Sequence, residues 1–121
     1  MDSKLTAKGE KQAEGLGNRF LKSGISFDAI YSSDLGRALR TAEQICAPIG
    51  QEKIIQEEPS LRERSLGNIE GLTYPELADR MPEDHKRHVT GDPDYNPKGG
   101  ESWRDFLNRA EISLKEIALR H

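Results

Sequence analysis

Arg37 and Glu63 are the residues whose setting most clearly indicates chemistry. Arg37 lies in the segment Tyr31-Ser-Ser-Asp-Leu-Gly-Arg-Ala-Leu-Arg-Thr-Ala42, which passes from an expected strand into an expected helix. Open α/β sheets bind ligands at the edge where the strands end. A planar guanidinium beside the free amides of a helix start can hold a phosphoryl group. The alternative is an ordinary surface arginine on a strand–helix connection.

Glu63 lies in a second informative segment, Leu61-Arg-Glu-Arg-Ser-Leu-Gly-Asn-Ile-Glu-Gly-Leu72, where it stands between Arg62 and Arg64. A carboxyl group in a phosphate pocket can protonate the leaving oxygen, provided that burial brings its pKa close to neutrality. The alternative is that Glu63 only pairs with its arginine neighbours on the surface.

Helical and extended patterns predict the elements that would position these residues. The expected helices cover 7–22, 38 onward, 73–81, 82–90 and 102–120, the expected strands cover 28–31 and 53–56, and 91–100 is an expected loop. The two strands and the helix between them would form one βαβ unit.

Capping and burial can also be predicted. A hydroxyl of Ser32-Ser33-Asp34 should cap the second helix, Thr73 with Glu76 should form a capping box, and Ser102 with Asp105 should cap the last helix. Apolar spacing also predicts the inward face of the first helix, formed by Ala13, Leu16, Phe20 and Leu21. The inward face predicted for the last helix consists of Trp103, Phe106, Leu107, Ala110, Leu114, Ile117 and Ala118.

Composition limits the function classes. The chain has 121 residues, which suits one domain, and its hydrophobic content of 34% against 32% charged residues is lean for an α/β protein. Missing buried strands would produce that deficit. The net charge of −3 argues against nonspecific nucleic-acid binding, and no apolar run has the length of a membrane span. The single cysteine, Cys46, falls on an apolar helical stripe and is expected in the core, and no Cys/His cluster has metal spacing.

Taken together, these segments resemble the histidine phosphatase superfamily, also called phosphoglycerate mutase-like. Leu5-Thr-Ala-Lys-Gly-Glu-Lys-Gln-Ala13 and Gly99-Gly-Glu-Ser102 are similar to its first-helix and last-helix motifs. The resemblance implies an α/β fold, as a partial three-layer α/β/α domain over residues 1–121 with central strands missing. It also implies that Arg37 binds phosphate and that Glu63 is the proton donor and acceptor.

Two histidine motifs of that family have no counterpart in this sequence. The family has a strand ending in Arg-His-Gly, which supplies the nucleophile, and a later Ser-His-Gly or Thr-His-Gly element. None of the three histidines here precedes a glycine, and we expect His85, His88 and His121 to be solvated. We therefore expect a fragment that is itself inactive. In-frame stop codons just outside both ends would count against this.

The resemblance implies that the parent protein hydrolyses phosphomonoesters through a phosphohistidine intermediate. The alternatives are phosphoglycerate mutase activity, a noncatalytic phospho-ligand binding pseudoenzyme, or a fragment that cannot fold unaided. The interval after Leu72 lacks the adjacent arginines of the mutases, with Lys86 and Arg87 as the nearest basic pair. Tyr74, Tyr95 and Trp103 could form an apolar pocket wall, although tryptophan on a helical stripe is more often core.

The remaining expectations concern partners and location. The partner should be a small phosphorylated metabolite, with no nucleic acid, membrane, metal or cofactor involved. The expected location is the cytoplasm, and a homodimer is left open.

Overall fold

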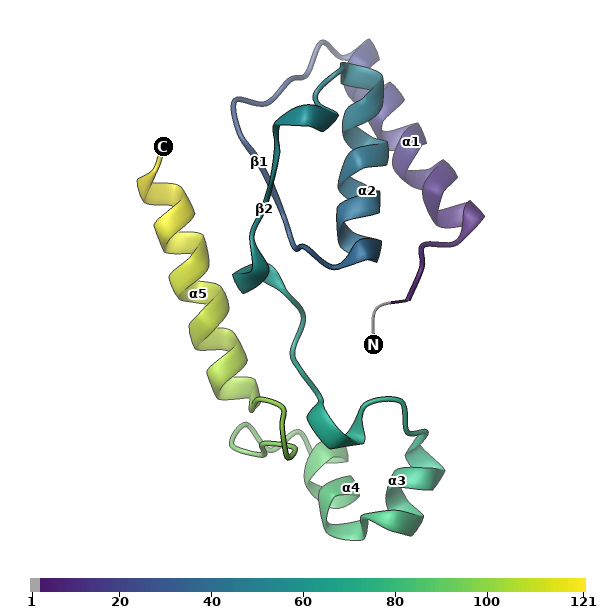
Figure 1. Ribbon diagram of the computed structural model, residues 1–121, viewed down its shortest axis with the longest axis vertical. Coiled ribbons are helices and arrows are strands. Elements are labelled where there is room, and N and C mark those ends of the chain that lie inside the picture. The colour runs from purple at the N-terminus through teal and green to yellow at the C-terminus, as the bar shows by residue number, and fades with distance from the viewer. Residues whose placement is uncertain (1–2) are drawn as a thin grey trace. The chain divides into compact units, whose positions relative to one another are not determined.

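The chain folds as two compact units in the computed structural model, which describes residues 3–121. One unit contains the described residues up to Arg62, and the other contains Glu63–His121 (Figure 1). Within the described residues, five α-helices accompany a two-stranded parallel sheet. The predicted α/β class is confirmed, whereas the single domain over residues 1–121 stays a prediction.

The first unit is built around a strand–helix–strand arrangement. Its elements are α1 (Ala7–Lys22), β1 (Ile30–Ser32), α2 (Gly36–Cys46) and β2 (Ile55–Glu57). The two strands are parallel, with Ile30 opposite Ile55 and Ser32 opposite Glu57. The predicted strand–helix–strand order is therefore confirmed. Both strands begin two residues later than predicted, because their limits follow the pairing between them.

The helices α1 and α2 pack through small residues. Ala13 and Cys46 are buried, so the core role predicted for Cys46 is confirmed, and burial raises the pKa of its thiol. Gly17 lies so close to the carbonyl oxygen of Ile45 that an added Cβ would overlap it. The prediction that Leu21 faces inward is wrong, since it is 56% exposed. The contact between α1 and the end of α2 is made at Gly17, and Leu21 lies one turn further along α1, past this contact.

The second unit contains the remaining helices, α3 (Tyr74–Arg80), α4 (Pro82–Val89) and α5 (Trp103–Leu119). The predicted capping box is confirmed. The Thr73 hydroxyl accepts from the Glu76 amide at 3.3 Å, and the Glu76 carboxylate accepts from the Thr73 amide at 2.8 Å. The Ser102 hydroxyl accepts from the Asp105 amide at 3.1 Å, as predicted for the last helix.

The core of this unit is small and consists of Ile69, Leu77 and Tyr95. The inward face predicted for the last helix is wrong at Leu107 and Leu114, which are 59% and 60% exposed. Within this unit α5 extends away from α3 and α4 (Figure 1). The helix pattern was correct, but its middle turns have no neighbouring helix in the unit to cover them.

Candidate functional site

Arg37 occupies the first turn of α2, directly after β1, as the sequence predicts. Its side chain is exposed and its Nη1 donates to the Ser3 hydroxyl at 3.3 Å. The predicted hydroxyl cap is wrong. Leu35 is the N-cap residue, and the Ser33 hydroxyl accepts at 3.3 Å from the Leu35 amide, one residue before the helix. Leu35, an apolar residue, thus occupies the N-cap position where a hydroxyl was expected.

Positive charge surrounds Arg37. An open cavity of about 450 Å³ is lined by Lys4, Arg37 and Arg40, together with the carboxylate of Glu10. Arg40 is largely neutralised, because its Nε lies 2.9 Å from Glu10 and its Nη1 lies 3.6 Å from Glu43. Lys4 and Arg37 thus provide the excess charge. Guanidinium and ammonium groups at a helix start suit a phosphoryl anion.

Glu63 lies on an exposed part of the second unit, ahead of the short helical turn at Gly67–Ile69. Its Oε1 accepts from the amide of Arg64 at 2.9 Å. The guanidinium groups of Arg62 and Arg64, which were considered as surface partners of Glu63, have other contacts. Arg62 donates from Nε to Asp34 at 2.6 Å, and Arg64 is buried.

Arg64 fixes the backbone beside Glu63. Its Nε donates to the carbonyl oxygen of Glu101 at 3.0 Å and its Nη2 donates to that of Tyr95 at 3.4 Å. The guanidinium lies 4.9 Å from the centre of the Trp103 ring, where a cation is attracted to the aromatic face. The residue after Glu63 is therefore held in a single place.

Glu101 provides the second attachment. Its Oε1 accepts from the Ser65 amide at 3.1 Å and lies 2.6 Å from Nη2 of Arg109, while the Ser65 carbonyl accepts from the Glu101 amide at 3.0 Å. The Arg109 hydrogen bond holds the pKa of Glu101 below its ordinary value. Arg109 Nη2 also lies 3.5 Å from the Glu63 carbonyl oxygen. The positioning roles of Glu101 and Arg109 were not predicted, although Gly99-Gly-Glu-Ser102 is similar to a family motif.

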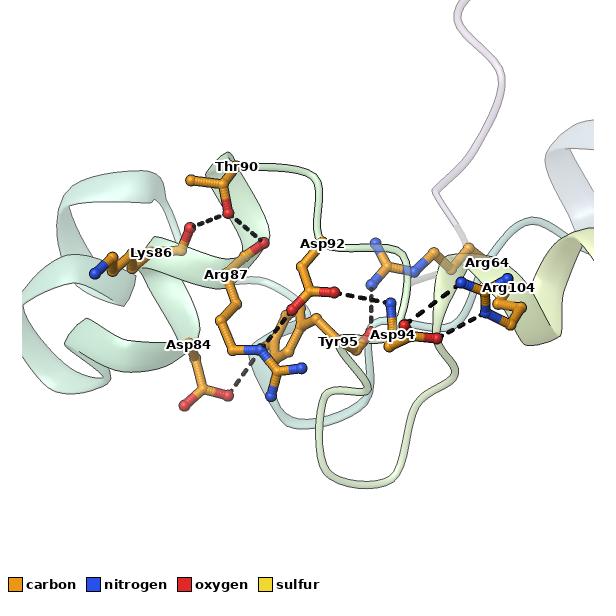
Figure 2. A network of polar contacts seen from close by, with 9 residues as sticks. All are labelled: Arg64, Asp84, Lys86, Arg87, Thr90, Asp92, Asp94, Tyr95 and Arg104. Atoms are coloured by element: carbon orange, nitrogen blue, oxygen red, sulfur yellow. Dashed lines mark hydrogen bonds and ion pairs between the residues drawn. The ribbon is translucent and has the colours of Figure 1, made fainter.

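A further network joins α4 to the loop that follows it (Figure 2). The Tyr95 hydroxyl donates to Asp84 at 2.8 Å, and Arg87 Nε lies 3.0 Å from Asp92. Burial, with the Asp84 hydrogen bond, raises the pKa of Tyr95 to about 12. The Arg87 guanidinium lies 5.3 Å from the centre of the Tyr95 ring. This network gives Tyr95 a core position and not the pocket-wall position considered for it.

His88 differs from its predicted solvated state, and that prediction is wrong. Its Nδ1 is buried and has no hydrogen-bond partner among residues 3–121. Its ring lies 6.0 Å from that of Tyr74 and 6.3 Å from that of Tyr95. Burial lowers its pKa, and the nearby charges of Arg64 and His85 lower it further. The polar run around His88 had suggested a solvated helix, but the two tyrosines cover the imidazole.

Neither a metal site nor a membrane-spanning helix is found among the described residues. No group of histidine, cysteine and acidic side chains within residues 3–121 has the arrangement of a metal site. No helix in that range combines the length and apolar content needed to cross a membrane.

The two predicted site residues belong to different units, Arg37 to the first and Glu63 to the second. Each is found in the local setting that the sequence predicts: a helix start after a strand, and a loop before a glycine-rich turn. Their action on one common phosphoryl group stays a prediction.

Comparisons with known proteins agree with the motifs. The family model "Histidine phosphatase superfamily (branch 1)" matches residues 1–121. The "Phosphoglycerate mutase-like protein 4" of Arabidopsis thaliana is 34% identical over 100% of the chain and 52% of its own length. The "Metal-independent phosphoserine phosphatase" of the same plant is 35% identical over 100% of the chain and 50% of its own length.

Solved structures agree as well. "Bacillus stearothermophilus YhfR" matches with a TM-score of 0.84 at 36% identity, over 99% of this chain and 57% of that one. The chain thus spans about half the length of the curated relatives it matches.

Proposed function

Because the chain belongs to the histidine phosphatase superfamily, we propose that the whole protein hydrolyses phosphomonoesters. Arg37 binds the transferred phosphoryl group, and Glu63 protonates the leaving oxygen and then activates water. The observation that carries this proposal is the cationic cavity around Arg37, at the start of the helix α2. Names of similar proteins include both phosphatase and mutase terms.

The nucleophile in this proposal is a histidine that becomes phosphorylated. His85, His88 and His121 do not fit that role, since none precedes a glycine and the Nδ1 of His88 is buried. We therefore propose that the 121-residue chain by itself binds phosphate without turning over a phosphomonoester. This behaviour would match the pseudoenzyme alternative if the whole protein also lacked activity.

Binding of phosphate tests the role of Arg37. Calorimetric titration of the complete chain with inorganic phosphate or vanadate should show saturable binding that Arg37→Ala abolishes. Arg40→Ala is the matched control, because Glu10 and Glu43 already neutralise Arg40 in the same cavity. Equal losses in both variants, or unchanged binding in Arg37→Ala, would contradict the assignment.

Hydrolysis tests the role of Glu63. In a longer form of the protein that hydrolyses 4-nitrophenyl phosphate, Glu63→Gln should lower kcat by a factor of about 10² or more. Saturable hydrolysis by the 121-residue chain, abolished in Glu63→Gln, would show that the chain is active alone. Conversion of one phosphoglycerate isomer into the other would instead favour the mutase alternative.

We also propose a cytoplasmic location, a small phosphorylated metabolite as the partner and no cofactor. Subcellular fractionation would test the location. The oligomeric state, for which a homodimer remains open, can be measured by light scattering.

A further inference from the structure

The second unit contains a cavity that the proposed chemistry does not use. It has a volume of about 510 Å³ and lies between the turn at Gly67–Ile69, the start of α3, and α4. Its apolar lining includes Leu66, Leu72, Tyr74 and Pro75. No charged side chain lines it among the described residues. Its volume is in the range of small-molecule sites.

His88 is the polar side chain of interest in this lining. Two lining residues carry hydroxyls: that of Thr73 already accepts a hydrogen bond from the Glu76 amide, and Tyr74 is 63% exposed. The lowered pKa keeps the His88 imidazole neutral near pH 7, so one ring nitrogen carries a proton and the other does not. A buried unpaired N–H is tolerated less often than a buried unused acceptor. Since Nδ1 is the buried nitrogen without a partner, the proton belongs on Nε2.

The cavity lies close to the proposed proton donor. Leu66, which lines it, follows Glu63 by three positions in the same unit. Three residues span at most about 11 Å between their Cα atoms. Arg64 and Ser65 fix the intervening backbone through Glu101. Glu63 and the cavity lining at Leu66 thus lie on one short segment of backbone that Glu101 holds in place.

We propose that this cavity binds the organic part of the substrate, as a flat, uncharged, apolar group bearing one hydrogen-bond acceptor, to which His88 donates. This inference rests on the proposed function, because it treats the bound group as part of a substrate, but the binding itself needs no turnover. Tyr74 and the leucines supply apolar contact, and His88 supplies one polar contact. A carboxylate is disfavoured because no cation lines the cavity to pair with it.

Isosteric probes without phosphate test the binding directly. Ligand-observed NMR on the complete chain at pH 7.5 would compare isoquinoline, naphthalene, which lacks the ring nitrogen, and 2-naphthoate, which adds a carboxylate. We expect isoquinoline and naphthalene to bind and to compete with each other. The naphthoate should bind at least about tenfold more weakly than naphthalene.

The variant His88→Phe separates the hydrogen bond from the apolar contact. It should weaken isoquinoline binding about threefold to tenfold and leave naphthalene within about twofold. His88→Gln keeps an N–H donor and should restore part of the loss. His85→Phe is the matched control on the same helix, outside the cavity lining, and should change neither affinity. Tyr74→Lys adds a cation at a 63% exposed position and should reverse the preference against 2-naphthoate.

Several outcomes would overturn the inference. They are the absence of binding by both neutral probes, equal effects of His88→Phe on isoquinoline and naphthalene, and unchanged exclusion of 2-naphthoate in Tyr74→Lys. If His88→Phe unfolds the unit, the Gln and Lys variants still decide the matter. Probe binding without phosphatase activity in the whole protein would refute the proposed function alone, whereas activity without probe binding would refute this inference alone.

Discussion

Glu101 is predicted to hold the loop that carries Glu63 through a measurable pairing with Arg109. The carboxylate receives two hydrogen bonds from Arg109, with Nη2 at 2.6 Å and Nε at 3.3 Å, and a third from the Ser65 amide at 3.1 Å. The side chains of Arg109 and Glu101 are only 28% and 20% exposed. The perturbation is a double-mutant cycle of Glu101→Ala and Arg109→Ala.

The expected magnitude follows from this partial burial. Hydrogen bonds to charged groups contribute about 1.5–3 kcal/mol, and fully exposed ion pairs contribute about 0–1 kcal/mol. A pair that is mostly but not fully buried should show a coupling of about 1–2 kcal/mol. Glu101→Ala alone should cost more, about 2–3 kcal/mol, because it also leaves the Ser65 amide without its acceptor.

Urea unfolding followed by tryptophan fluorescence is a suitable assay. Trp103 is the single tryptophan of the chain and lies in the Glu63–His121 unit, so its signal reports on that unit. The matched control is the pair Asp94 and Arg104, which has a similar distance of 2.7 Å but is more than half exposed on both sides. It should show no measurable coupling.

A coupling below about 0.5 kcal/mol for the Glu101 pair, or one no larger than that of the control pair, would refute the reasoning. The positioning of Glu63 would then have to come from Arg64 alone.

Three further predictions concern the same unit. Gly67→Ala should destabilise the unit by more than about 2 kcal/mol, because Gly67 has φ of +53° and an added Cβ would meet backbone atoms. Gly91→Ala should cost only about 1 kcal/mol, because Gly91 has φ of +70° but open space around it. Similar urea midpoints for the two variants would contradict this prediction. Because the pKa of Glu101 lies below its ordinary 4.5 in the folded chain, its contribution is present above that pH and is lost as the pH falls through the lowered pKa of the folded state. A plot of the urea midpoint against acidic pH should therefore be flatter for Glu101→Gln than for the unmodified chain. Leu77→Ala should cost about 2–5 kcal/mol and Leu107→Ala almost nothing in the same assay, since Leu77 is 3% and Leu107 is 59% exposed.

Features that depend on local sequence could be predicted. Thr73 and Glu76 stand three residues apart and cap each other without any distant partner, so the start of α3 is visible in the sequence. The same is true of Ser102 at the start of α5. Leu35 shows the limit of this reasoning, because the N-cap of α2 falls two residues after Ser33, whose hydroxyl was expected to cap the helix.

Features that depend on distant residues could not be predicted. His88 lies in a polar run, and only the rings of Tyr74 and Tyr95 bring it into a covered position. Arg64 was considered as a surface partner of Glu63, yet Trp103 and the carbonyl oxygens of a later loop bury it. Motif spacing identified Arg37 and Glu63 as candidates, but no local pattern reports which groups hold their backbones in place.

The pairing of Arg87 in the second unit supports the proposed phosphatase function over the mutase alternative. A substrate carboxylate needs a guanidinium or ammonium group that is free to pair with it. Arg87 belongs to the nearest basic pair after Glu63, but it is paired with Asp92 and lies over the Tyr95 ring (Figure 2). Binding a carboxylate there would break the contacts that join α4 to its loop. The cavity beside Leu66 has an apolar lining instead, which supports the proposal that the substrate carries an uncharged organic group.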